Sequence, residues 1–444
     1  MTNSDRPILI CPHLAASPDE YHVWFTGHGT ERHWVCAACA ARFPELPAEL
    51  IEVTDSLFEH CQSEACWSGI CGRPEIRHRP SSFSFTHEEC SPRFPYGDRW
   101  IDIQPDLKSS GQWFLLMASG DFAVTNPRRG EFEVLHRLSE LGFEIDEEAV
   151  LRVSPKHDYA AIFAASGRHA CVFEIQTGVI TARIDRGEYR PENSHYPIAF
   201  FESNGRSLLV AATDWNRLDV IDPATGVLLT DRGPTSYRKG GQRPQHYLDY
   251  FHAQLLVSPD GNWIADNGWV WHPWGIVRSW NLCDWLERNP WESEDGPSLK
   301  TLAGRAYFWD GSLCWIDDST IAIWGWGEDD EWLIPAVRFF DVSVGRELYW
   351  FPGPETRPPR AWPPKKLARS LFFDQYLFSV HEERGIAVWD ASSGERLLQD
   401  PSLAPIQYHP HSKEFLSRTP NGLRLSRLTP ANRDRGGRGH QEQG

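Results

Sequence analysis

The chain has 444 residues, of which 41% are hydrophobic and 13% aromatic, and its formal net charge is −17. This length exceeds one ordinary domain, and the acidic charge argues against nucleic acid as the main partner. No stretch reaches the roughly 18 apolar residues of a membrane helix, and residues 1–13 lack a signal-peptide pattern, so we expect a cytoplasmic protein without a membrane partner. Its ten cysteines are then expected to be reduced or metal-bound.

The sharpest chemical signal lies near the N-terminus. Cys11 and His13 are followed, after 22 intervening residues, by Cys36 and Cys39. Two close pairs on either side of a loop supply the four ligands of a tetrahedral structural zinc site. A catalytic zinc keeps one ligand position open and has a general base nearby. Here four good ligands are present and no such base is found, so a structural zinc is favoured over a catalytic one.

The residues between the two pairs are typical of a small β-ribbon. Residues 21–26 alternate as a strand, 27–29 form a turn and 32–35 return as a second strand. A head this small has little core of its own, so the metal would supply much of its folding free energy. Two alternatives stay open: unligated thiols, or replacement of the His13 ligand by one of three other histidines, His22, His28 and His33.

A predicted helix ends this head, which spans residues 1–60. Pro44 and Pro47 open an apolar pattern that runs through Ile51 to Phe58, and we interpret it as a strut. A connector, 61–99, follows with a second cysteine group, which is either a set of buried thiols or a second metal site. The candidate ligands are His60, Cys61, Cys66, Cys71, His87 and Cys90.

The rest of the chain repeats two strand–turn–strand units. The unit at 385–398, GIAVWDASSGERLL, has relatives at 171–180, 218–229 and 337–349. A second unit with proline in its turn precedes each of them, as in LVSPDGNWIA at 256–265. Together the two units make a four-stranded antiparallel sheet. Such a sheet cannot bury both of its faces alone, so its copies must stack on one another.

This pattern resembles the WD40-type β-propeller of degenerate, bacterial type. The resemblance covers roughly residues 100–428, and it implies a propeller domain over 100–430. It implies a mainly β fold with seven blades, although six or eight stay open. The Trp-Asp pair of the family occurs once, at Trp389–Asp390, and no blade has a Gly-His start, so the family's buried Ser-His-Asp-Trp network is not implied. The innermost strands would begin near Ile101, Leu151, Ile198, Leu255, Leu313, Leu371 and Ile406.

The last blade shows only three clear strands before a polar tail, 431–444, which we expect to be disordered. Residues 82–86, SFSFT, alternate as a strand far upstream. We expect this segment to supply the missing outer strand, so that both ends of the repeat region close the ring and no sheet edge stays open.

Thirteen of the 21 tryptophans lie between Trp263 and Trp350. Trp280 and Trp315 stand on strands and are expected in the core. Two insertions, 286–299 and 325–333, place rings beside carboxylates, which is typical of a surface for a cationic partner. The predicted partner-binding residues are Trp291, Glu292, Glu294, Asp295, Glu328, Asp329, Asp330, Glu331 and Trp332.

The leading hypothesis is a non-catalytic protein–protein interaction scaffold, in one version a neutraliser of a basic partner. No nucleophile elbow, HExxH motif or phosphate-binding loop is present. The alternative is a hydrolase or lyase at the mouth of the propeller channel, and a third hypothesis gives the binding role to the zinc head. The groups that could meet at the channel, although turn-stabilising roles are more common there, are His157, Asp158, Asp214, Asp260 and His381.

Overall fold

The computed structural model divides into two compact units, Met1–Ile76 and Arg77–Gly444. In the first unit it describes the backbone of four strands and residue 76. In the second it describes 77–430, apart from the segments 80–82, 92–98, 238–240, 272–273, 307, 309–310, 327–333, 357–368 and 420–421. The predicted zinc ligands Cys11, His13 and Cys39 and the tail 431–444 lie outside the described residues, as does the side chain of Cys36.

The first unit contains one four-stranded sheet in the order β2-β3-β1-β4. β2 (Tyr21–Thr26) and β3 (Glu31–Cys36) pair antiparallel, which confirms the predicted ribbon. β1 (Ile8–Ile10) runs parallel to β3, with Ile10 opposite Trp34, and β4 (Ile51–Val53) pairs antiparallel with β1.

The helix predicted over residues 44–60 is wrong at Ile51–Val53. These residues form β4, because two β-branched side chains flank one polar residue and the edge of β1 offers unpaired backbone groups. An apolar pattern of only three residues fits a strand as well as a helix, so it does not distinguish the two.

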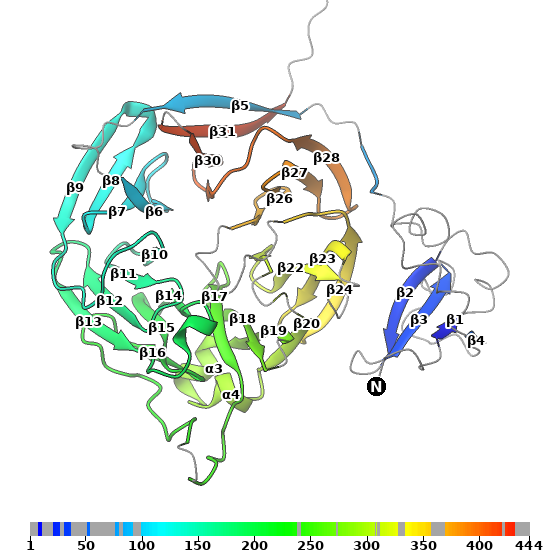
Figure 1. Ribbon diagram of the computed structural model, residues 1–444, viewed down its shortest axis with the longest axis horizontal. Helices are drawn as coiled ribbons and strands as arrows, with labels where there is room; N and C mark the ends of the chain where they lie inside the picture. Colours follow the sequence, from blue (N-terminus) through cyan, green and yellow to red (C-terminus); the bar gives the residue numbers. More distant parts are fainter. Residues whose placement is uncertain are drawn as a thin grey trace, which may run out of the picture. The chain divides into compact units, whose positions relative to one another are not determined.

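The second unit is a ring of seven sheets (Figure 1), which confirms the predicted seven-bladed propeller. Each blade is an antiparallel meander whose first strand lies toward the axis. The first three blades consist of β6 (Trp100–Pro105), β7 (Trp113–Met117), β8 (Asp121–Asn126) and β9 (Glu131–Arg137); β10 (Ala149–Val153), β11 (Tyr159–Ala164), β12 (His169–Glu174) and β13 (Ile180–Asp185); and β14 (Ile198–Ser203), β15 (Arg206–Asp214) and β16 (Arg217–Ile221).

The remaining blades follow the same order. They consist of β17 (Phe251–Val257), β18 (Trp263–Val270), β19 (Trp274–Asn281) and β20 (Lys300–Ala306); β21 (Leu313–Trp315), β22 (Thr320–Trp326), β23 (Ile334–Asp341) and β24 (Arg346–Pro352); β25 (Leu371–Phe373), β26 (Leu377–His381), β27 (Gly385–Asp390) and β28 (Glu395–Asp400); and β29 (Gln407–His409), β30 (Glu414–Thr419), β31 (Gly422–Pro430) and β5 (Phe83–Cys90). Short helices α3 (Leu282–Glu287) and α4 (Glu292–Asp295) lie between β19 and β20.

The core lies between neighbouring blades. Trp280 and Trp285, both at most 1% exposed, pack with apolar residues of blades three and four, and similar clusters join the other blades. Trp280 is therefore a core residue, as predicted, and Trp315 packs at the edge of the cluster between blades four and five. Each blade thus buries its two faces against its neighbours, which a single blade cannot do.

Closure of the ring uses the strand predicted upstream of the repeats. β5 pairs with β31 over eight residues, from Cys90 opposite Leu423 to Phe83 opposite Pro430. The observed strand is longer than the predicted 82–86 segment because residues 87–90 continue the ladder. Figure 1 shows β5 lying alongside β31, with one end of β5 reaching the first blade.

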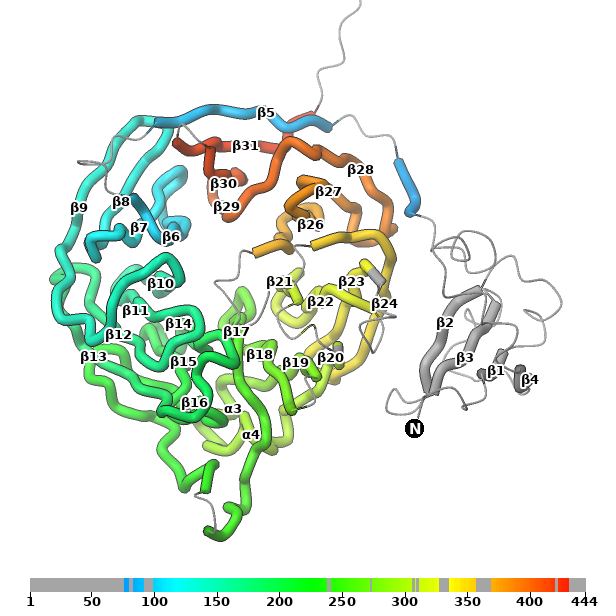
Figure 2. Tube along the Cα trace, in the orientation of Figure 1, coloured from blue at the N-terminus to red at the C-terminus, as the bar shows by residue number. Residues whose placement is uncertain are grey.

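Blade three departs from the pattern. It has three strands, and its fourth position is reduced to a single bridge between Ile221 and Leu228. The chain then runs through 222–250 before β17 begins, and Figure 2 shows the described parts of this segment, 222–237 and 241–250, extending outward from the ring. Among the described residues, none of the helices has the length and apolarity that a membrane crossing requires.

Candidate functional site

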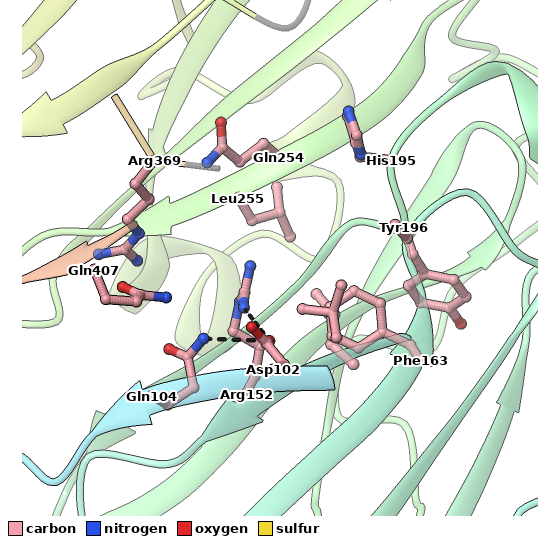
Figure 3. Close-up of a pocket in the computed structure, with 13 residues that line it drawn as sticks. Asp102, Gln104, Arg152, Phe163, His195, Tyr196, Gln254, Leu255, Arg369 and Gln407 are labelled. Carbon is pink, nitrogen blue, oxygen red and sulfur yellow. Dashed lines mark hydrogen bonds and ion pairs between the residues drawn. The ribbon is translucent and has the colours of Figure 1, made fainter. Parts of the chain in front are cut away.

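The first candidate site is a cavity on the axis of the ring, which we call the axial cavity. The first strands of the blades line it, with Asp102 and Gln104 from β6, Arg152 from β10 and Gln254 from β17. Its volume is about 50 Å³. Figure 3 shows Arg369 and Gln407 on one side of the view and His195 and Tyr196 on the other.

Charges of both signs meet in the axial cavity. Asp102 is 5% exposed and accepts hydrogen bonds from the Leu151 backbone N–H at 2.8 Å and from Gln104 Nε2 at 3.4 Å. Arg152 Nη1 lies 4.0 Å from Asp102 Oδ2 and donates to the Leu151 carbonyl at 2.9 Å. About one third of the Arg152 side chain, 33%, stays accessible.

Burial shifts the ionisation of the cavity groups. Desolvation lowers the pKa of Arg152 to about 10, against the opposing effect of Asp102. Arg369 keeps an accessible surface, but the blades that surround it still lower its pKa by desolvation. Burial lowers the pKa of His195 to about 3, and the charges of Arg186 and Arg152 act in the same direction. At neutral pH both cavity arginines are therefore cations and His195 is neutral.

The loop that carries His195 is held by Arg186, which is 4% exposed. Its guanidinium donates to the carbonyls of Gly167 and Ser194, at 2.8 and 2.9 Å, and lies 4.9 Å from the centre of the Tyr196 ring. These hydrogen bonds fix the turn before β14 and therefore set the position of His195 beside the cavity.

The second candidate site is a chain of aromatic rings on the loops of blades two to four, which we call the aromatic face. Its base is buried: Phe251 and Trp269, 1% and 2% exposed, stack with ring centres 4.5 Å apart. Rings from other loops lie against this base or against one another, with centres 4.9 to 6.5 Å apart. They are Tyr189, Trp215, Tyr237, Tyr247 and Trp271.

The outer rings of the aromatic face are accessible to solvent. Tyr189, Tyr237 and Trp271 are 48%, 46% and 40% exposed, and among the described residues Tyr349 is the other large aromatic side chain with comparable exposure. Two arginines border the rings: Arg190 lies 5.7 Å from the Trp271 ring centre and Arg243 lies 4.4 Å from that of Tyr247. Exposed rings beside guanidinium groups are the composition of interface hot spots.

Two carboxylates of the acidic insertion in blade four are buried, whereas a binding surface would expose them. Glu292 and Glu294 belong to helix α4 and are 0% and 6% exposed, so their carboxylates do not form a solvent-facing surface. Glu292 Oε1 accepts a hydrogen bond from the Ser298 N–H at 2.6 Å, and Glu294 forms a 2.5 Å ion pair with Arg232. These acidic residues take part in buried hydrogen bonds and ion pairs. Blade three has no fourth strand, so side-chain contacts such as Arg232–Glu294 fix the segment that follows β16.

Two other predicted residues of this insertion are closer to the surface. Asp295 is 54% exposed but its carboxylate lies 2.8 Å from His246 Nδ1. Trp291 is partly buried, stacks on His246 with ring centres 4.1 Å apart and lies beside Arg232, whose guanidinium carbon is 5.3 Å from its ring centre. The second predicted group, Glu328, Asp329, Asp330, Glu331 and Trp332, lies outside the described residues.

Two members of the second cysteine group, His87 and Cys90, lie on strand β5. Three residues apart on a strand, they point to opposite faces. Cys90 is buried in the core between blades seven and one, where desolvation raises its thiol pKa, and His87 Nδ1 bonds Ser426 Oγ at 2.9 Å. No cluster of three metal-ligating side chains occurs among the described residues, and Cys61, Cys66 and Cys71 are not among them.

The channel-mouth candidates are turn residues. Asp158 and Asp260 accept bonds from Ser154 Oγ and Ser258 Oγ at 2.7 and 2.6 Å, within the two Pro-containing turns. Asp214 and His381 Nδ1 accept from backbone N–H groups of their own turns, those of Trp215 at 2.7 Å and Glu383 at 3.1 Å. His157 Nδ1 lies 3.3 Å from Asp106, which follows β6 in the neighbouring blade, and none of the five bonds another.

The residues that form the axial cavity and the aromatic face were not predicted as sites from the sequence. Their residues come from separate blades, so no short spacing marks them. Polar residues at alternate positions of the predicted first strands, such as Asp102, Arg152 and Gln254, are the one signal that could have indicated a polar axis.

The architecture defines the class of this chain: it is a seven-bladed β-propeller. Among solved structures, it is similar to Saccharomyces cerevisiae Sqt1, at a TM-score of 0.49 and 14% identity over 81% of this chain and 96% of that one. It is also similar to a chain from a crystal structure of the mitotic checkpoint complex, at a TM-score of 0.44 and 10% identity over 77% and 96%. No protein-family model and no curated protein matches the sequence.

Proposed function

We propose that this propeller is a non-catalytic scaffold that binds another protein through the aromatic face. The observation that carries the proposal is the clustering of three exposed rings: Tyr189 and Trp271 lie against the buried Phe251 ring, and Tyr237 lies against Tyr247 of the same face. Large rings that need little ordering on binding, with arginines at their edge, are the side chains that dominate protein interfaces.

The size and the charged groups of the axial cavity do not favour the alternative function, a hydrolase or lyase acting at the propeller channel. Its volume of about 50 Å³ is far below the roughly 300 Å³ at which small-molecule pockets begin. Its described charged groups are two arginines, which stay protonated at neutral pH, and an aspartate that already accepts hydrogen bonds.

The test compares full-length tagged protein with a double variant, Tyr237→Ala with Trp271→Ala, in affinity purification from the source cells. The matched control is Tyr349→Ala, because Tyr349 is 40% exposed but lies on β24, outside the aromatic face. A protein that co-purifies with the wild type and the control should be lost from the double variant. If the double variant retains every such protein, the aromatic face is not the binding surface.

A basic partner is a narrower form of the same proposal. Its support is the net charge of −17 and the run Glu328, Asp329, Asp330 and Glu331. Reversing these four charges should weaken the complex and reduce its dependence on salt. Binding that is unchanged by the reversal would remove the basic partner and leave the aromatic face to be judged by the double variant. The expectation of a bacterial, cytoplasmic protein belongs to this proposal.

The zinc head is also proposed, as a structural element. β1 and β3 are parallel with Ile10 opposite Trp34, so both strands end at the same edge of their sheet. Cys11 and His13 follow β1 in the sequence. Cys36 is the last residue of β3, and Cys39 follows it, which supports one shared zinc site. If the head rather than the aromatic face binds the partner, removal of residues 1–60 will abolish co-purification.

A further inference from the structure

The axial cavity has more positive than negative charge among its described lining residues. Arg152 and Arg369 contribute two guanidinium groups, and Asp102 contributes the single carboxylate. The Asp102 carboxylate already accepts bonds from Leu151 N and Gln104 Nε2. The two arginines are close enough for Arg369 to disfavour the charged form of Arg152. A bound anion would relieve that repulsion.

Arg152 has hydrogen-bonding capacity left over. Its Nη1 donates to the Leu151 carbonyl, and among the described residues its other nitrogens have no hydrogen-bond partner. A guanidinium carries five N–H groups in a planar fork that matches the oxygens of carboxylates and phosphates. Figure 3 shows this guanidinium directed toward the middle of the group of lining side chains.

His195 supplies an independent observation. Its ring is 7% exposed and lines the cavity, and its Nε2 has no hydrogen-bond partner among the described residues. A buried ring nitrogen without a partner is costly, so such atoms point to a missing ligand or water. As a neutral imidazole, His195 can donate one N–H to an oxygen atom placed in the cavity.

The carboxamides of Gln254 and Gln407 complete the lining with further N–H donors. On the same volume measure, one water needs about 10–15 Å³. A cavity of about 50 Å³ therefore has room for a few waters or for one ligand of four or five heavy atoms.

We propose that the axial cavity binds a small free oxyanion of the phosphate, sulfate or carboxylate type, held by Arg152 and Arg369 with His195 and the two glutamines as neutral donors. The site is independent of the aromatic face, so either proposal can fail without the other.

The test is isothermal titration of the full-length protein with sulfate, inorganic phosphate and acetate at constant ionic strength set with chloride. Saturable binding of at least one oxyanion is expected. Tighter binding of sulfate and phosphate would identify a tetrahedral ligand, and tighter binding of acetate a carboxylate. Arg152→Gln should raise the Kd by about tenfold or more, because a charge-assisted hydrogen bond is lost.

The matched control is Arg129→Gln, whose side chain is 71% exposed and lies away from the cavity at the end of β8. A second variant, Gln254→Leu, removes a neutral donor and should weaken binding by a smaller factor if Arg152→Gln does not fold. Absence of saturable binding by all three oxyanions overturns the proposal. Equal weakening by Arg152→Gln and Arg129→Gln also overturns it, since the effect would then be general charge screening.

Discussion

Arg424 on β31 and Glu89 on β5 are cross-strand partners, and their side chains form a 2.5 Å ion pair between positions 335 residues apart. The pair marks the seam at which the two ends of the propeller meet. Both side chains are partly exposed, at 32% and 54%, so the ion pair itself adds little stability. The strand that carries Glu89 matters more, because it covers the edge of β31.

The first prediction concerns this seam. A chain that begins at residue 92 lacks β5, whereas a chain that begins at residue 77 keeps it. The shorter chain should lose roughly 3 kcal/mol or more of unfolding free energy, because it exposes the partners of Phe83 and Phe85. Urea denaturation measures the difference. The control, Glu89→Ala, should cost about 1 kcal/mol or less. Equal stability of the two truncated chains would show that β5 does not close the ring.

The second prediction concerns the buried charges beside α4. Arg232 is 1% exposed at its side chain and pairs with Asp219 at 2.6 Å and with Glu294 at 2.5 Å. Arg232→Met leaves the buried Glu294 carboxylate without its cation and leaves Asp219 with Arg217 alone, so it should cost about 3–5 kcal/mol. Adding Glu294→Gln should recover part of this loss, because one buried charge is then removed.

The control for that network is Arg288→Ala, which removes an ion pair to Asp284 from a side chain that is 76% exposed. Chemical denaturation should show a change of about 0.5 kcal/mol or less for it. A similarly small effect of Arg232→Met would mean that solvent reaches the network.

The third prediction concerns pH. The pKa of His195 is about 3 in the folded protein, below its ordinary value of 6.5. Between these two values the unfolded chain binds more protons, so stability falls as the pH falls from about 6.5 toward 3. His195→Gln should reduce this slope by up to about 1.4 kcal/mol per pH unit. Denaturation midpoints from pH 7 to pH 4 measure it, with His411→Gln, at an exposed position, as the control. A slope that His195→Gln leaves unaltered would contradict the buried, neutral histidine.

The fourth prediction concerns the metal. Purified full-length protein should contain about one zinc per chain, and Cys36→Ser or Cys39→Ser should lower that content. The matched control is Cys283→Ser, because Cys283 is an exposed free thiol on α3. Elemental analysis after dialysis decides the result. Wild-type protein without zinc, or an equal loss with Cys283→Ser, would rule out the proposed ligands.

Much of the fold could be read from the repeats. Alternating apolar residues and turns rich in Pro, Asp and Gly recur along the chain, and each unit needs neighbours to bury its faces. The series of expected first strands predicted seven blades, and the strand starts at Ile198, Leu313 and Leu371 agree with the structure. The missing fourth strand of the last blade predicted the upstream closing strand. The helix expected over residues 44–60 is wrong at Ile51–Val53, where three residues cannot separate a helical period from a strand period.

Local sequence determined the strands, their turns and the stacking, because these depend on side chains a few residues apart. Only the tertiary structure decided which side chains meet. It buried Glu292 and Glu294, which looked like surface acids, and paired Glu294 with Arg232, 62 residues upstream in the sequence. It also gathered Arg152, His195 and Arg369 from separate parts of the ring around one cavity. The reason is geometric: closing the ring brings first strands together on its axis and loops together on its faces, and neither neighbourhood leaves a spacing in the sequence.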